Sequence, residues 1–125
     1  MPIAFDAQGA PKLRVNIDSG NGQFRALDAL IDTGASRCYL PPQLAKDLRL
    51  SVQGHVEVHT GHASTIEASY FVHLKIPGIF DGFFPFVEMP ALWDMVVIGR
   101  DFLRTMRFIY DGQAGTFELV AHAYP

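Results

Sequence analysis

Hydrophobic and polar residues alternate near the start of the chain. From Leu13 to Asp18 every second residue is apolar, which predicts a strand with one buried face. Ser19-Gly20-Asn21-Gly22 follows, and Asn-Gly is a common sequence in hairpin turns because both residues tolerate positive φ. A second strand is predicted from Gln23 to Ile31. It ends on the uncharged pair Leu30-Ile31, which indicates a buried end.

The pattern then changes period once and returns to alternation. Pro41 to Leu48 is predicted to be a helix, because its prolines fall in the first turn and Leu44 and Leu48 lie one turn apart. Strands are predicted over Val52–Ile76, and Thr60-Gly61-His62 is expected at the tip of a long hairpin.

The last third of the chain predicts short elements. Asp81-Gly82 is interpreted as a turn that starts a strand, and Asp111–Gly115 as the turn of a closing hairpin. The expected elements are strands over Phe83–Met89, Val96–Ile98, Phe108–Tyr110 and Thr116–Val120 and a short helix over Arg100–Met106. We therefore expect one mainly β domain over residues 1–125, with one helix early and one late.

Composition narrows the class of protein. The 125 residues are 49% hydrophobic, with ten Phe, which excludes intrinsic disorder. A formal charge of −3 gives no basic footprint, so no nucleic-acid partner is expected. The single cysteine, Cys38, excludes an intrachain disulfide. No apolar run reaches the ~18 residues of a membrane helix, and Met1–Ala10 lacks the pattern of a signal peptide. We expect a cytoplasmic protein with no membrane segment.

One carboxylate stands out by its context. Asp32-Thr33-Gly34-Ala35-Ser36 directly follows the apolar strand end Ala29-Leu30-Ile31. A carboxylate at the end of a buried strand loses hydration on one side, so its ionisation becomes sensitive to neighbouring groups. Gly34 allows the backbone to turn back closely, and its N–H is expected to reach the carboxylate. A short strand, Cys38-Tyr39-Leu40, and then the predicted helix follow.

With these residues the sequence resembles the retropepsin-like aspartic proteases, the single-domain relatives of retroviral proteases. The first anchor is Leu30–Ser36, followed by the helix around Leu44–Leu48. The second anchor is Val97-Ile98-Gly99-Arg100-Asp101-Phe102-Leu103, which is similar to the family's second signature. The resemblance covers roughly Leu13 to Leu119 and implies a closed β-barrel of the acid protease fold, with a flap hairpin between the anchors.

The resemblance implies peptide hydrolysis without a cofactor. Two carboxylates at ~3 Å cannot both ionise, so the pair shares one proton. The ionised carboxylate takes a proton from a water that attacks the scissile carbonyl, and the protonated one hydrogen-bonds the carbonyl oxygen. The substrate is expected to be an extended peptide or protein segment.

This chain offers one such loop. Asp18-Ser19-Gly20 is the tempting second copy, but it lies where a hairpin turn is required, beside Asn21-Gly22, and no helix follows it. The remaining solution is a homodimer in which each subunit supplies one Asp32. In the family the residue matching Thr33 hydrogen-bonds across the two-fold axis, so Thr33–Ser36 are assigned to positioning the dyad.

The other residues that the resemblance marks have weaker signals. Gly99 and Arg100 are expected to brace the active-site loop or the dimer, and a purely structural interpretation is nearly as good. Retroviral members pair this arginine with an acidic residue where Ser36 stands, so we expect another partner, Asp28 or Asp111. The expected flap tip is Thr60, Gly61 and His62, and the expected pocket wall is Trp93, Met95 and Val97, for which a plain core role competes.

Three further groups of residues have interpretations of their own. His55, Glu57 and His59 alternate on one strand face, which suits a zinc site or, more simply, a solvated polar face; no metal is expected. Cys38 is interpreted as a buried small apolar residue. Phe80, Phe83, Phe84 and Phe86 are expected in the core or in subunit contacts.

Ala35 leads to an expectation about the working pH, and the flap leads to an alternative function. Pepsin-like relatives have a hydroxyl residue where Ala35 stands, so this dyad is expected to work nearer neutral pH. The flap tip has only Gly61, whereas well-known flaps are glycine-rich. A non-catalytic retropepsin-like domain that dimerises or binds peptides is therefore the alternative to an aspartic endopeptidase.

Overall fold

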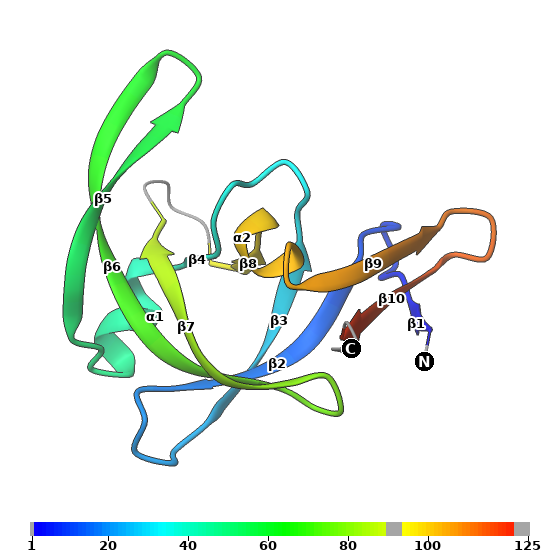
Figure 1. The fold of residues 1–125 in the computed structure, drawn as a ribbon, viewed down its shortest axis with the longest axis horizontal. Helices are drawn as coiled ribbons and strands as arrows, with labels where there is room; N and C mark the ends of the chain where they lie inside the picture. Colours follow the sequence, from blue (N-terminus) through cyan, green and yellow to red (C-terminus); the bar gives the residue numbers. More distant parts are fainter. Residues whose placement is uncertain (1, 90–93, 122–125) are drawn as a thin grey trace.

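The computed structural model describes residues 2–89 and 94–121 and is mainly β (Figure 1). Its strands are β1 (Ile3–Ala4), β2 (Lys12–Asp18), β3 (Arg25–Ile31), β4 (Tyr39–Leu40), β5 (Val52–Thr60), β6 (Ala63–Ile76), β7 (Phe80–Glu88), β8 (Val96–Ile98), β9 (Met106–Asp111) and β10 (Thr116–Ala121). Its helices are α1 (Pro42–Asp47) and α2 (Arg100–Leu103). Neither helix has the length and apolar character needed to cross a membrane.

Six strands close into the predicted barrel. Their order is β2-β3-β8-β4-β7-β6, and β6 pairs back onto β2 through Asn16–Asp18. The β3–β8 and β4–β7 pairs are parallel, whereas the hairpins β2–β3 and β6–β7 are antiparallel. Because β3 and β8 run in parallel, the segments that follow them emerge at the same end of the barrel. This topology brings the two sequence anchors together.

The barrel interior contains the apolar side of the alternating strands. Leu13, Val15 and Ile17 are at most 4% exposed, as the period-two pattern predicts. The core continues through α1 and α2 and reaches β10. Its largest fully buried apolar side chains are Phe86, Phe102, Phe117, Ile17, Leu40, Leu74, Ile76 and Ile98. Burial of these side chains supplies most of the free energy that holds the barrel closed.

The phenylalanines of β7 divide between the two faces of that strand. Phe80 and Phe84 meet the ring of Phe102 edge-to-face, with centroids 5.0 and 5.2 Å apart, and Phe86 is fully buried. These contacts fix α2 against the barrel wall. Phe83 points outward, is 59% exposed and stacks on His73 with centroids 5.1 Å apart. The core prediction is therefore confirmed for three of these rings.

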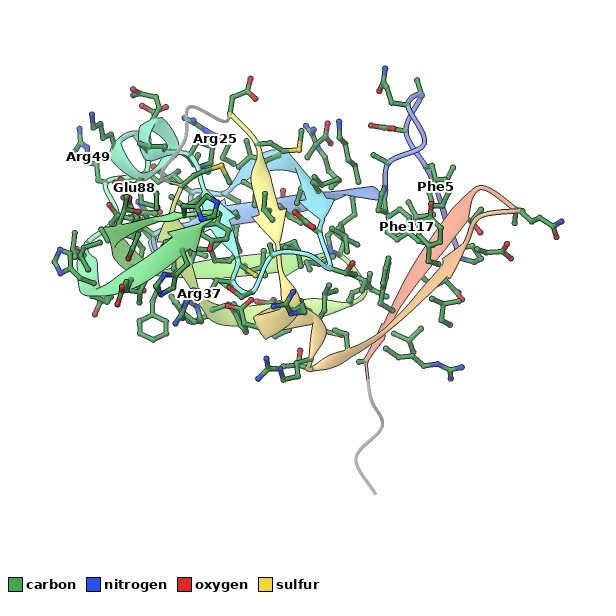
Figure 2. The ribbon with its side chains drawn as sticks, turned by 90° about the horizontal axis from the view of Figure 1, so that it is seen from above. Phe5, Arg25, Arg37, Arg49, Glu88 and Phe117 are labelled. Atoms are coloured by element: carbon green, nitrogen blue, oxygen red, sulfur yellow. The ribbon has the colours of Figure 1, made fainter. Side chains whose placement is uncertain are left out.

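The chain termini contribute a separate three-stranded sheet, β1-β10-β9. Aromatic rings pack across it, with the Phe5 centroid 4.9 Å from Tyr110 and 6.3 Å from Phe117. Figure 2 shows Phe5 and Phe117 together on this sheet, beside the barrel. The two residues of β1 are too few to show a period, so the sequence pattern missed this strand.

The segment after β2 is the predicted hairpin turn. Asp18 is fully buried, and its carboxylate accepts the N–H groups of Gly20 at 2.6 Å and Gly22 at 2.8 Å. Both glycines have positive φ, 105° and 86°. Asp18 is therefore committed to closing a turn, and the segment is not a second catalytic loop.

Two predicted boundaries, the start of β7 and the end of α2, were wrong by three residues. Asp81-Gly82 lies inside β7, because the chain already turns at Pro77–Ile79, where Gly78 has a φ of 75°. Pro-Gly is a strong turn signal that the strand pattern had hidden. The late helix ends at Leu103 and not at Met106, because Met106 begins β9 and pairs with Ala121.

Candidate active site

Asp32 is the first residue after β3, where the chain leaves the barrel. Its N–H donates to Ile98 O at 3.0 Å, which continues the β3–β8 pairing to this residue. Its half-buried carboxylate accepts the Gly34 N–H on Oδ1 at 2.8 Å, the contact expected from the sequence. A Cβ atom at Gly34 would lie 3.1 Å from that oxygen. The loop backbone therefore holds the carboxylate closely.

The second anchor is hydrogen-bonded to this loop. The backbone N–H of Arg100 donates to Ala35 O at 2.8 Å, and the side-chain Nη1 of Arg100 donates to Thr33 O at 2.9 Å. Gly99 packs so tightly that an added Cβ would lie 2.1 Å from Arg37 O. Residues separated by more than sixty positions in the chain thus form one structural unit. The geometry agrees with the bracing role expected for Gly99 and Arg100.

The acidic partners expected for Arg100 were wrong. Asp28 pairs with Arg14 at 3.1 Å, and Asp111 accepts the N–H of Ala114 at 3.0 Å. Arg100 donates instead to a backbone carbonyl, that of Thr33. A carbonyl oxygen accepts a hydrogen bond from a guanidinium N–H with the same geometry as a carboxylate oxygen does, and it adds no negative charge to the loop. Ser36 is exposed at the position where retroviral members have the acidic residue.

Cys38 follows the loop and is fully buried, as predicted. Its thiol donates to Asp101 Oδ1 at 3.2 Å, and its sulfur accepts the Gly99 N–H at 3.4 Å. Burial raises the pKa of the Cys38 thiol, and the negative charge of Asp101 raises that pKa further. The thiol therefore stays protonated at neutral pH and acts as a hydrogen-bond donor.

We expect native Cys38 to resist alkylation. Only the thiolate is nucleophilic, and a raised pKa lowers the thiolate fraction at every pH below it. At pH 8 iodoacetamide should modify the folded protein about 10²-fold more slowly than the urea-unfolded chain. Mass spectrometry of timed samples measures both rates, and similar rates in the two states would contradict the buried thiol.

The β5–β6 hairpin lies on the same side of the barrel as the Asp32 loop, where both rise above the strands in Figure 1. Gly61 occupies its tip with a φ of 60°, and His62 beside it is exposed. The structure describes the backbone of Thr60 as the end of β5. The flap role of this hairpin stays a prediction.

The residues expected in the pocket wall lie in different environments. Val97 is 2% exposed within β8, on the face opposite Val96 and Ile98, which belong to the core cluster. Met95 lines a groove of about 380 Å³ whose walls come from α1, β3 and β8, and Asp28 and Asp94 also line it. Trp93 lies outside the described residues.

The histidines of β5 face outward, as the alternation predicts. His55, Glu57 and His59 are exposed, whereas Val58 on the other face is 4% exposed. Glu57 accepts the Ser64 hydroxyl at 2.7 Å and lies 3.7 Å from His59 Nε2. Among residues 2–89 and 94–121, no three His, Cys, Asp or Glu side chains gather as a metal site.

One contact of the site was missed by sequence reasoning, and it centres on Asp101. Its carboxylate accepts both the Cys38 thiol and, at 2.8 Å, the Phe102 N–H. The signal was present as the acidic residue directly after Gly99-Arg100, but the sequence gives no indication that this carboxylate meets Cys38. The contact depends on the pairing of β4 with β8, where Tyr39 lies opposite Val97, and only the fold shows this pairing.

The matches to known proteins agree with the structure described above, in which an Asp-Thr-Gly loop follows the end of a barrel strand. The family described as "gag-polyprotein putative aspartyl protease" matches residues 13–105, well over half of the chain. The chain therefore belongs to this family of retropepsin-like aspartic proteases. Its sequence matches no curated protein directly.

Several solved structures share the fold. A retropepsin-like aspartic protease from Rickettsia conorii superposes with a TM-score of 0.70 at 18% identity, covering 95% of this chain and 88% of that one. EIAV protease complexed with the inhibitor HBY-793 gives 0.60 at 19% identity, covering 82% and 92%. The retroviral protease-like domain of Ddi1 from Leishmania major gives 0.54 at 16% identity, covering 87% and 88%. These likenesses establish the acid protease fold.

Proposed function

We propose that this protein is a homodimeric aspartic endopeptidase in which two Asp32 carboxylates, one from each subunit, activate a water. The observation that carries the proposal is the placement of Asp32, half-buried at the end of β3 with its Oδ1 bound by the Gly34 N–H. Family membership supports the activity. The loop residues Thr33, Gly34, Ala35 and Ser36 position the dyad, and Gly99 and Arg100 brace the loop.

The reaction follows from two carboxylates that share one proton. The ionised carboxylate removes a proton from the water between them, and the water oxygen attacks the scissile carbonyl. The protonated carboxylate donates a hydrogen bond to the carbonyl oxygen, and the dyad then passes the proton taken from the water to the leaving nitrogen as the C–N bond breaks. Because the pair titrates as a unit, its pKa values belong to the dyad. No cofactor takes part in these steps.

The need for two subunits follows from the single catalytic loop. Asp18 closes a hairpin turn, and Asp81 lies in β7 in a 2.6 Å contact with His73. Neither follows a buried strand end with a loop like that of Asp32. Thr33 is exposed at the turn of the loop, so it is accessible to the same loop of a second copy.

The substrate in this proposal is an extended peptide under two β5–β6 hairpins. The hairpin edge offers backbone groups that add strand-like hydrogen bonds to such a peptide. Thr60, Gly61 and His62 form the tip that closes over it, and Trp93, Met95 and Val97 stay the predicted pocket wall. Cytoplasmic localisation also stays a prediction.

We expect the pH optimum to lie closer to neutrality than that of pepsin-like enzymes. Ala35 has no hydroxyl group to donate to the catalytic carboxylate, so the ionised form receives one fewer hydrogen bond. The variant Ala35→Ser should shift the acid limb of the kcat/KM profile downward, because a new donor favours ionisation. Activity of the natural protein confined below about pH 4 would contradict the argument.

The alternative is a non-catalytic domain that dimerises or binds peptides, which the single glycine of the hairpin tip favours. Incubating the protein with a mixed peptide pool across pH, with and without a transition-state mimic of peptide hydrolysis, separates the two functions. Cuts that map to defined bonds and disappear with the mimic support the protease. Binding of peptides with no cut at any pH supports the alternative.

A further inference from the structure

Asp101 lies at the start of α2 and joins two segments that flank the active-site loop. Its Oδ1 accepts the Cys38 thiol at 3.2 Å and the Phe102 N–H at 2.8 Å. The sulfur of Cys38 in turn accepts the Gly99 N–H at 3.4 Å. Asp101 is half-buried and Cys38 fully buried, so little water competes for these bonds.

These contacts complete a series of attachments along the loop. The loop starts at Asp32, whose N–H is bound to Ile98 O at 3.0 Å, and Arg100 holds Thr33 and Ala35 in its middle. Cys38 is the point where the loop re-enters the barrel at β4. The Val87 N–H also donates to Cys38 O at 2.9 Å, and Tyr39 pairs with Val97 of β8, so the thiol contact adds a side-chain attachment between this end of the loop and α2.

We propose that Asp101 is a positioning residue, which holds the Asp32 loop in register through the Cys38 thiol. The proposal rests on the proposed protease function, because the register of the loop matters most where two Asp32 carboxylates must meet. A displacement of about 1 Å at a catalytic group can cost about 10²-fold in rate. A carboxylate acceptor suits the task, since a hydrogen bond to an ionised group is stronger than one between neutral groups.

The chemistry of the thiol supports a permanent attachment. Burial raises the pKa of Cys38, so its proton stays in place through the neutral range and the thiol keeps donating. The Gly99 N–H occupies the acceptor side of the sulfur. Donor and acceptor capacities of the sulfur are thus both used within the site.

The test compares three single variants. Asp101→Ala removes the acceptor and should lower kcat by about 10-fold to 100-fold with little change in KM. Asp101→Asn keeps Oδ1 as an acceptor and should retain most of the activity. The matched control is Asp111→Ala, which also loses a carboxylate bond to a backbone N–H, at Ala114, but lies at the end of β9. The control should leave kcat unchanged.

A double-mutant cycle isolates the thiol contact. Cys38→Val keeps an apolar side chain of similar size and removes the donor, so it should lower kcat as Asp101→Ala does. The loss in the combined variant should be smaller than the product of the two single losses, because both changes break the Cys38–Asp101 bond and each also removes one separate contact, to the Gly99 N–H or the Phe102 N–H. Independent effects that multiply, or losses fully explained by the unfolded fraction, would overturn the positioning role.

Hydrogen exchange separates this inference from the proposed function. The Gly34 N–H is bound to Asp32 Oδ1, so its exchange rate reports the geometry of the loop without any substrate. Asp101→Ala should speed exchange at Gly34 by about 10-fold, whereas Asp101→Asn and Asp111→Ala should not. Unchanged exchange in Asp101→Ala overturns the inference even if the protein is a protease. Faster exchange in a protein that cuts no peptide supports the inference and refutes only the protease. If Asp101→Ala fails to fold, Cys38→Val gives the same two readouts.

Discussion

Replacing Asp32 with Asn is expected to lower peptide cleavage by about 10³-fold or more, because an amide can neither accept a proton from water nor share one with its partner. The fold should survive the change. Asn keeps an Oδ1 atom for the Gly34 N–H, which is bound at 2.8 Å, and the side chain is only half-buried. The measurement is kcat/KM on a peptide that the natural protein cuts, with the unfolding midpoint recorded in parallel.

Asp111→Asn is the control for this experiment. Asp111 is exposed at the end of β9, and its carboxylate accepts the Ala114 N–H at 3.0 Å. Because Asn keeps an Oδ1 acceptor for this N–H, both activity and the unfolding midpoint should stay close to natural values. Cleavage that persists in Asp32→Asn would show that another group does the chemistry.

Replacing Gly99 with Ala should produce the largest loss of stability. The added Cβ would lie 2.1 Å from Arg37 O, 2.5 Å from Arg37 C and 2.9 Å from Ala35 O. All three are backbone atoms that cannot move as a flexible side chain does, so the loop or α2 must shift. We expect a loss of about 3 kcal/mol in the free energy of unfolding, together with most of the activity. Urea unfolding measures the first quantity.

The matched control is Gly54→Ala, within β5. A Cβ at Gly54 would meet no atom within 4 Å, and its backbone does not need positive φ. The free energy of unfolding should therefore change by less than about 0.5 kcal/mol. If Gly99→Ala were as stable and active as this control, the close packing of the two anchors would be refuted.

Much of the fold was predictable because its strands are half-buried. Leu13–Asp18 alternates, and the structure buries the apolar residues of that strand as the pattern requires. The helix over Pro42–Asp47 and the hairpin after Asp18 carry local signals, proline in a first turn and Asn-Gly, that depend on no distant residue. These elements were therefore predictable from their own residues, without knowledge of the contacts between distant segments.

The contacts within the site were less predictable, because they join distant segments. The loop at Asp32 followed from its motif, but the Arg100 contact was assigned to a carboxylate and proved to be with the carbonyl of Thr33. The Cys38–Asp101 contact spans 63 positions and depends on the pairing of β4 with β8 at Tyr39 and Val97. No periodicity or motif encodes such a contact. A sequence alone indicates which groups carry chemistry more readily than which groups hold them.

The central claim is that the active unit contains two copies of Asp32, and a mixing experiment tests it most directly. Natural protein is held at constant concentration and equilibrated with increasing amounts of Asp32→Asn, and cleavage is then measured. If each site needs one carboxylate from each of the two subunits, mixed dimers are inactive, so an equal amount of the variant should reduce activity to about half, and a ninefold excess to about one tenth. Activity that stays constant as the variant is added would show that a single chain suffices, and that result would contradict the account.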